Sequence, residues 1–205
     1  SPAVCQPLGH GADYVVESLS KVMNGHSEVM LGLLCGRTGQ VSDFRETLSV
    51  WGMSSSPFDA WLALRGLSTL HLRMERSSGN AHHVARQLAS HEAIRRVHYP
   101  GLANHPDAET IRRLLRAEAA GCMITFELAG GAGAAEHFIA RARQIPFCPS
   151  LGEVSTTLSH PASTSHRGLT DEQRAGLGIY DGTIRLSLGT ESADWVWRAI
   201  EAGLQ

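Results

Sequence analysis

Residues 11–27, GADYVVESLSKVMNGHS, decide how the first part of the chain is organised. Residues 12–16 form a short β-favouring run, and a second run follows at residues 28–35. The segment between the two runs is rich in hydroxyl groups and ends in an Asn-Gly turn signal. The pattern predicts two buried strands and a connection between them that carries Lys21.

Lys21 is the only lysine of the chain, against 17 arginines. An arginine stays protonated under biological conditions, whereas a lysine amine can be tuned to act as a nucleophile, a base or a Schiff-base partner. A general bias toward arginine explains most of the imbalance but not the one lysine that remains. Lys21 is therefore the candidate catalytic residue, and a surviving surface lysine is the alternative.

Composition excludes several classes of function. The chain has 205 residues, 42% of them hydrophobic and 19% charged, which is enough for one large or two small globular domains. The net charge of -2, without a basic stripe, argues against nucleic acid as a partner. The four cysteines lack the paired short spacing of zinc sites, so we expect reduced thiols in a cytoplasmic protein and no metal. No apolar run is long enough to span a membrane.

The remaining pattern is that of an α/β protein whose sheet changes character near residue 75. A long amphipathic run after Pro57 extends toward Leu88, with a bend or interruption expected at Gly66. The other expected helices are residues 41–50, 106–118, 130–143 and 192–204, and the other expected strands are residues 123–128, 145–147 and 183–188.

Two serines near Lys21 suggest which cofactor the amine serves. Ser18 and Ser20 would offer hydrogen-bond donors to a phosphate group close to the amine. Pyridoxal phosphate requires both features, because its aldehyde needs a covalent amine partner and its phosphate needs donors in the same pocket. For each serine, a role in turn or cap chemistry is the alternative.

Motifs along essentially the whole chain resemble the pyridoxal-phosphate enzymes of cysteine and methionine metabolism, which include methionine γ-lyase and the cystathionine lyases and synthases. The lysine segment is the core of the resemblance. The further matching stretches are residues 57–70, 99–102, 121–124, 150–152, 160–163 and 181–189, together with His166.

The resemblance implies a fold type I enzyme of the aspartate-aminotransferase kind. Residues 1–74 would be the C-terminal part of its large cofactor-binding domain, and residues 75–205 its small C-terminal α/β domain. By the same resemblance Lys21 holds pyridoxal 5'-phosphate as a Schiff base, and Ser18 and Ser20 contribute to the phosphate site. Arg185 would bind the α-carboxylate of the substrate.

Ser150 would lie beside that carboxylate and the lysine. For Arg185 the alternative is a surface arginine at the end of a strand, and for Ser150 it is turn chemistry. His26 is expected to serve a turn or packing role, while His160 and His166 flank the substrate entrance or cap loops. The chain departs from the family pattern at Glu17, at Ser20 where threonine is usual, and at Ser155 where many members carry glutamate.

The activity that the resemblance implies is cleavage of a C–S or C–O bond in a γ-substituted amino acid such as methionine, cystathionine or an O-acylhomoserine. The alternatives are γ-replacement, as in cystathionine γ-synthase or a homoserine-ester sulfhydrylase, and a non-catalytic structural subunit. The family's phosphate loop, stacking aromatic and ring-nitrogen aspartate are not in this sequence. We therefore expect an N-terminal half that completes the site, and a homo-oligomer, by resemblance a tetramer.

Overall fold

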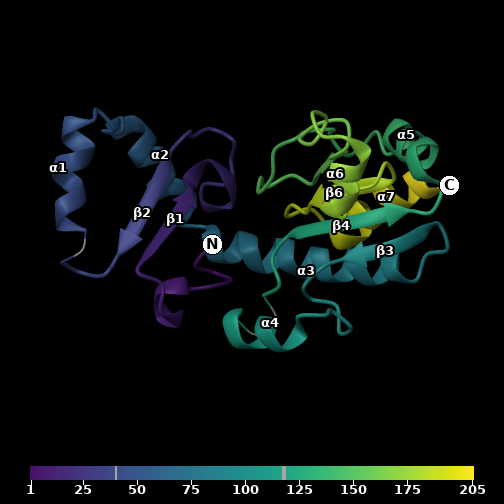
Figure 1. Ribbon diagram of the computed structural model, residues 1–205, viewed down its shortest axis with the longest axis horizontal. Helices are drawn as coiled ribbons and strands as arrows, with labels where there is room; N and C mark the ends of the chain where they lie inside the picture. Colours follow the sequence, from purple (N-terminus) through teal and green to yellow (C-terminus); the bar gives the residue numbers. More distant parts are fainter. Residues whose placement is uncertain (40, 117–118) are drawn as a thin grey trace.

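The computed structural model describes residues 1–39, 41–116 and 119–205, which form two antiparallel sheets connected through a long helix, α3 (Figure 1). A two-stranded sheet with α1 and α2 lies at one end of the molecule, and a four-stranded sheet with α5 to α7 lies at the other. The elements in chain order are η1 Pro7–His10, β1 Tyr14–Ser18, η2 Leu19–Met23, β2 Gly32–Gly36, α1 Ser42–Val50, α2 Pro57–Leu67, α3 Leu70–Ala89, β3 Ile94–His98, α4 Ala108–Leu114, β4 Met123–Leu128, α5 Gly131–Arg141, β5 Thr157–Ser159, α6 Asp171–Gly176, β6 Thr183–Ser187 and α7 Ala193–Leu204.

The first two predicted strands exist, and they pair with each other as an antiparallel hairpin in which Val16 lies opposite Leu34. The prediction that both are buried is wrong, because in β1 Tyr14 is 46% exposed and Val16 is 80% exposed, and in β2 the residues are partly buried or exposed. β-Branched and aromatic residues favour a strand without deciding what covers its faces. Among the described residues, no further strand pairs with this hairpin.

The long amphipathic run after Pro57 is two helices, α2 and α3, which separate after Leu67. The interruption expected at Gly66 thus comes at residues 68–69, just after this glycine, which is the second-last residue of α2. A Cβ atom at Gly66 would come within 2.6 Å of the backbone oxygen of Asn24. The glycine therefore allows α2 to pack directly on the segment that follows Lys21. The helix expected at residues 41–50 is confirmed as α1.

The four-stranded sheet has the order β3-β4-β6-β5, and every pairing in it is antiparallel. The central strands β4 and β6 confirm the expected strands at residues 123–128 and 183–188. The edge strands have weaker sequence signals, because β3 contains consecutive arginines and β5 is three residues long. The expected strand at residues 145–147 is wrong, since only an isolated bridge joins Phe147 to Leu158 there.

Two apolar clusters form the interior, and α3 contributes to both. Its first turns supply Leu70 and Met74 to a small cluster that includes Leu19 and Met23 beside the lysine. Its later turns supply residues such as Leu88 to a larger cluster between the sheet and the helices α3, α5 and α7. Helix α3 therefore links the lysine segment to the four-stranded sheet through buried apolar contacts on both sides.

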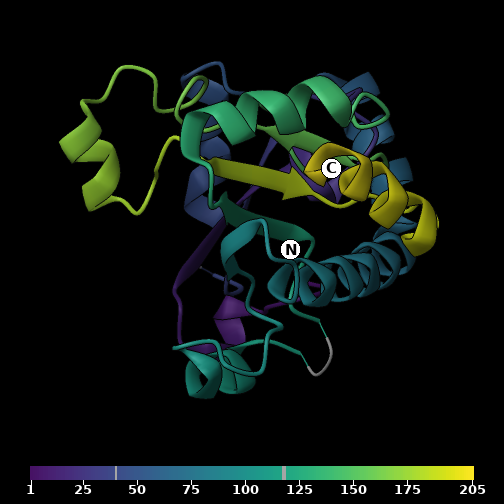
Figure 2. The ribbon, with the colours of Figure 1, turned by 90° about the vertical axis from the view of Figure 1, so that its right-hand side faces the viewer.

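The remaining helices differ little from expectation. α5 and α7 correspond to the expected helices at residues 130–143 and 192–204, and Ser192 caps α7 by accepting a hydrogen bond from the backbone N–H of Trp195. α4 ends at Leu114 because Leu115 is extended, and the expected end at Glu118 lies outside the described residues. α6 belongs to a segment that projects from the body of the molecule (Figure 2). None of the helices described here is long and apolar enough to cross a membrane.

Candidate active site around Lys21

Lys21 lies in the middle of a short wide helical turn, η2, which connects β1 to β2 as the sequence predicts. The turn is closed by a hydrogen bond from the backbone N–H of Asn24 to the carbonyl of Leu19, at 3.1 Å. Lys21 itself departs from helical geometry, with φ -105° and ψ -137°. A wide turn distorted at one residue is a feature that proteins often place at functional sites.

Lys21, Ser150 and Arg185 meet although they are far apart in the sequence. The Lys21 amine donates a hydrogen bond to the hydroxyl of Ser150 at 3.2 Å, and both groups are partly buried. Arg185 lies on β6 and donates from Nη2 to the carbonyl oxygens of Pro149 at 3.0 Å and Ser150 at 3.4 Å. Ser150 therefore touches the amine with its side chain and the guanidinium with its backbone.

Ser18 and Ser20 are placed differently from each other. The Ser20 hydroxyl accepts a hydrogen bond from the backbone N–H of Leu31 at 3.0 Å, which fixes its oxygen while leaving its proton to donate elsewhere. Ser18 ends β1 and is exposed. Ser20 thus lies on the Lys21 turn with its oxygen held in place, and Ser18 lies just before the turn, at the exposed end of β1.

The loop that carries Ser150 is hydrogen-bonded to β6 on one side and to the segment that follows Lys21 on the other. The backbone N–H of Gly152 donates to Ser187 Oγ at 2.8 Å, and the backbone N–H of Val154 donates to the carbonyl of Gly25 at 2.9 Å. Gly152 has φ +81°, and a Cβ atom there would lie 2.5 Å from the backbone nitrogen of Val22. Glycine is therefore required for the Ser150 loop to approach the Lys21 turn this closely.

A second set of polar side chains anchors the far end of that loop. Thr156 donates from Oγ1 to a carboxylate oxygen of Glu191 at 2.9 Å and accepts from the backbone N–H of Gly189 at 2.9 Å. Asn80 of α3 donates to the carbonyls of Gly189 and Glu191, at 3.0 and 2.9 Å. Asn80 is 2% exposed and Thr156 1% exposed, so the two bonds to Gly189 are buried, while the two bonds to Glu191 are partly buried.

Sequence reasoning missed Arg73, Asn80, Thr156 and Glu191. Arg73 is 9% exposed and donates to backbone carbonyls of the Lys21 turn. Its signal is available in the sequence, because Arg73 and Asn80 lie on the same face of α3 as the buried Met74, Ala81 and Val84. Polar residues on the apolar face of a helix need buried partners. Thr156 and Glu191 have no comparable local signal.

Contacts of three histidines are local, and that of His26 matches the turn role expected for it. Its Nδ1 lies 2.7 Å from the carbonyl of Asn24, within the turn after Lys21. His160 contacts the Ser163 hydroxyl and the Asp181 carbonyl, each at 2.8 Å, so it braces its own loop. His166 lies 2.8 Å from the Ser165 hydroxyl. Of the two roles open for His160, these contacts match loop capping.

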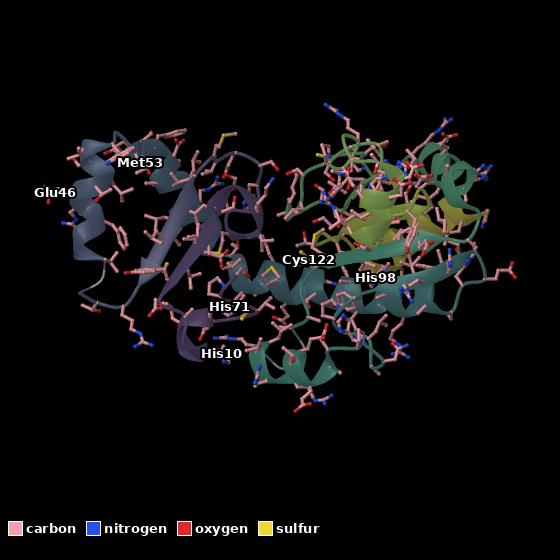
Figure 3. The ribbon with its side chains drawn as sticks, viewed as in Figure 1. His10, Glu46, Met53, His71, His98 and Cys122 are labelled. Atoms are coloured by element: carbon pink, nitrogen blue, oxygen red, sulfur yellow. The ribbon has the colours of Figure 1, made fainter. Side chains whose placement is uncertain are left out.

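Burial shifts the pKa of several groups outside the lysine contact. It lowers the pKa of Arg73 and raises the pKa of the Cys122 thiol, which lies where β4 begins beside α3 (Figure 3). Burial also raises the pKa of Tyr99 to about 12. Cys5, Cys35, Cys122 and Cys148 are all free thiols. No group of three or more His, Cys, Asp or Glu side chains that could hold a metal occurs in the described ranges.

Comparison with protein families gives a match over the whole chain. Residues 1–205 match the model of the Cys/Met metabolism PLP-dependent enzymes. An O-succinylhomoserine sulfhydrylase of Pseudomonas aeruginosa is 40% identical over 95% of this chain and 48% of its own length. A cystathionine γ-lyase of Saccharomyces cerevisiae is 38% identical over 100% of this chain and 52% of its own length.

Solved structures show the same relationship in three dimensions. The crystal structure of cystathionine γ-lyase from yeast superposes with a TM-score of 0.95 at 38% identity, over 100% of this chain and 52% of that one. The cystathionine γ-synthase of Xanthomonas oryzae pv. oryzae, in complex with aminoacrylate and cysteine, superposes with a TM-score of 0.93 at 40% identity, over the same shares.

The chain thus spans about half the length of the relatives that it matches, and its fold is part of the α/β fold of those fold type I enzymes. The family match, the identities and the superpositions agree with the resemblance carried by the lysine segment. This chain belongs to the pyridoxal-phosphate-dependent enzymes of cysteine and methionine metabolism.

Proposed function

We propose that this chain supplies the lysine-bearing part of a pyridoxal-phosphate-dependent lyase that breaks a C–S or C–O bond in a γ-substituted amino acid. Methionine, cystathionine and O-acylhomoserines are the candidate substrates. The observation that carries the proposal is the 3.2 Å contact between Lys21 Nζ and Ser150 Oγ, beside the two carbonyls that hold Arg185. An amine, a hydroxyl and a carboxylate-binding guanidinium are thus gathered in one place.

The residues present fit the part of a pyridoxal phosphate site that this chain would contribute. The Lys21 amine is partly buried and is bonded to a neutral hydroxyl, and among the described residues it forms no ion pair with a carboxylate. It is therefore available to an aldehyde. Ser20 retains a proton that can be donated to a phosphate oxygen, and Ser18 presents a second hydroxyl at the end of β1, just before the Lys21 turn.

When bound, pyridoxal phosphate supplies an aldehyde that combines with amines and a ring that withdraws electrons from the substrate α-carbon. Arg185 binds the substrate α-carboxylate with the fork of its guanidinium, whose plane is fixed by the carbonyls of Pro149 and Ser150. Lys21 removes the proton at the α-carbon, and Ser150 holds Nζ in position for that transfer. Lys21 also carries a proton to the departing sulfur or oxygen.

The Lys21→Ala variant of the full-length protein tests the assignment of the lysine. Wild-type protein treated with pyridoxal phosphate and borohydride should carry the reduced cofactor on the peptide that contains Lys21, and the variant should carry none there. A variant that still bound the cofactor with the wild-type absorption band near 420 nm, the approximate position for such cofactors, would exclude Lys21.

A second activity, γ-replacement, is favoured by the 40% identity to a sulfhydrylase and to a cystathionine γ-synthase. The two reactions differ in their products. Elimination releases 2-oxobutyrate and ammonia from methionine, cystathionine or O-acetylhomoserine without an added thiol, whereas replacement requires the thiol and consumes it. Assaying 2-oxobutyrate with and without added thiol decides between them, and no reaction with any of the three substrates would contradict both.

An N-terminal half is proposed to complete the site, because the relatives are about twice as long as this chain. Large apolar side chains that are exposed to solvent support this, because an N-terminal half would bury them; they include Met30, which is 90% exposed, and Trp51, which is 76% exposed. A homo-oligomer, by resemblance a tetramer, is the proposed assembly, and light scattering of the full-length protein tests it. The free thiols support a cytoplasmic location, which localisation of the tagged protein would test.

We also propose that residues 1–74 belong to the large cofactor-binding domain and residues 75–205 to the small one. The two separate apolar clusters support this division, with Met74 in the first and Ala81 in the second. α3 continues across the proposed boundary. Limited proteolysis and hydrogen exchange test the division. If residues 1–74 and 75–205 lose their protection independently, the division is supported; if they lose it together as a single cooperative unit, it is contradicted.

A further inference from the structure

Arg73 is a buried cation whose acceptors lie on the Lys21 turn, on α2 and at Thr69, the residue just before α3. Its guanidinium donates to the carbonyl of Val22 at 2.7 Å, the carbonyl of Met23 at 2.9 Å and the carbonyl of Gly66 at 2.8 Å. Its Nε donates to Thr69 Oγ1 at 3.1 Å. All four of these acceptors are neutral oxygens, so the charge is compensated by dipoles rather than by a carboxylate.

Two of the four bonds complete the turn that carries Lys21. Two carbonyls of that turn are satisfied locally, since Leu19 accepts from the N–H of Asn24 and Lys21 accepts from the N–H of Gly25. The next two, those of Val22 and Met23, would be unpaired at the end of so short a turn. The Arg73 guanidinium occupies both, and its third carbonyl belongs to α2. Arg73 thus ties the end of the lysine turn to the junction of α2 and α3.

The close fit around the guanidinium specifies an arginine. Gly25 has φ +76°, and a Cβ atom there would overlap Arg73 Nη1. A lysine at position 73 would present a single ammonium group, which cannot span carbonyls on both the turn and α2 as a planar fork does. The arrangement therefore depends on the shape of the side chain as well as on its charge.

We propose that Arg73 is a positioning residue that determines how the Lys21 side chain is presented to the cofactor and the substrate, an inference that rests on the function proposed above. Arg73 holds the two residues that follow Lys21, and the non-helical backbone of Lys21 is the point at which the turn would relax if they were released. The hydrogen bonds of the Arg73 side chain go to the Lys21 turn, to α2 and to Thr69, so its proposed effect on the reaction is exerted through Lys21.

The test compares Arg73→Lys, Arg73→Met and the control Arg76→Met, an exposed arginine on the same helix, in the full-length enzyme with its cofactor. For both Arg73 variants we expect kcat to fall by about tenfold or more while KM changes by less than about threefold, because misplacement acts on the reacting geometry. The visible circular-dichroism band of the bound cofactor should change, and Arg76→Met should match wild type.

Chemical labelling of Lys21 is a further measurement on the same variants, and it needs no bound cofactor. Trinitrobenzenesulfonate is applied to the cofactor-free full-length protein, and labelling of the peptide that contains Lys21 is followed by mass spectrometry. A loosened turn should raise the labelling rate of Lys21 by about threefold or more in both Arg73 variants, since the amine would lose its fixed position. If Arg73 only stabilises the fold, folded variants would melt at lower temperature but keep the wild-type kcat, dichroic band and labelling rate, which would overturn the inference.

Two outcomes remain to be separated. If both Arg73 variants fail to fold, Thr69→Val keeps the guanidinium and removes the acceptor of Nε, together with the 3.3 Å hydrogen bond from Thr69 Oγ1 to the carbonyl of Gly66. Intermediate changes in labelling and dichroism would then support the inference, and wild-type values would refute it. If wild-type protein shows no cofactor attachment at Lys21, the proposed function fails, while the labelling comparison still decides whether Arg73 positions the lysine.

Discussion

The contact between Lys21 and Ser150 gives the sharpest prediction for the proposed activity. In the Ser150→Ala variant the amine loses its 3.2 Å hydrogen bond to the Ser150 hydroxyl. A hydrogen bond to a charged group contributes about 1.5–3 kcal/mol, and the partial exposure of this pair favours the lower value because water replaces part of the lost bond. A loss of about 1.5 kcal/mol in the transition state corresponds to a roughly tenfold fall in kcat/KM.

The assay is release of 2-oxobutyrate by the full-length enzyme, with kcat and KM measured for the best of the three candidate substrates. Ser49→Ala is the matched control, because Ser49 is an exposed serine on α1. Thermal unfolding of both variants checks that Ser150→Ala is folded. A kcat/KM within about twofold of wild type in folded Ser150→Ala would show that this hydrogen bond is not used in the reaction.

Three further predictions concern the groups around this contact. Arg185→Lys keeps the charge but loses the planar fork, so kcat/KM should fall by about tenfold or more, and unchanged steady-state kinetics would remove Arg185 from the carboxylate site. Glu191→Gln weakens the bonds to Thr156, and urea unfolding should show a loss of about 1–3 kcal/mol; no loss would mean that the carboxylate charge is not needed there. The pKa of Tyr99 is raised to about 12 in the folded state, whereas a tyrosine in the unfolded state loses its proton at about pH 10. The free energy of unfolding should therefore decline as the pH rises from about 10 to about 12. Urea unfolding at pH 9 and pH 11 should show this decline in wild type and a flatter dependence in Tyr99→Phe, and equal slopes would contradict it.

Much of the fold could be predicted because its strongest elements carry local signals. The alternation in β4, the capping serine of α7 and the proline at the start of α2 are each visible in a few adjacent residues. The edge strands could not be predicted in the same way. β3 and β5 are held by pairing with β4 and β6, so their conformation depends on neighbours distant in the chain.

The candidate site divides along the same line. The position of Lys21 on a connection between two strands follows from the local pattern. The same pattern shows that Ser18 and Ser20 are close to Lys21 in the sequence. The contact of Lys21 with Ser150 joins residues 129 positions apart, and nothing in the residues near either one implies it without the resemblance to a family. The burial of Arg73 is an intermediate case, because the apolar face of α3 marks the arginine as unusual but does not name its acceptors.

By itself the sequence determined the strongest helices and central strands, the single lysine and the family to which the chain belongs, because these depend on residue identity and on spacing within short motifs along the chain. Only the tertiary structure decided which hydroxyl meets the amine, which carbonyls hold Arg73 and Arg185, and where glycine is needed for close approach. The physical reason is that a hydrogen bond requires its two atoms to lie within about 3 Å of each other. For groups far apart in the chain, that proximity is set by how the apolar faces of helices and sheets pack together.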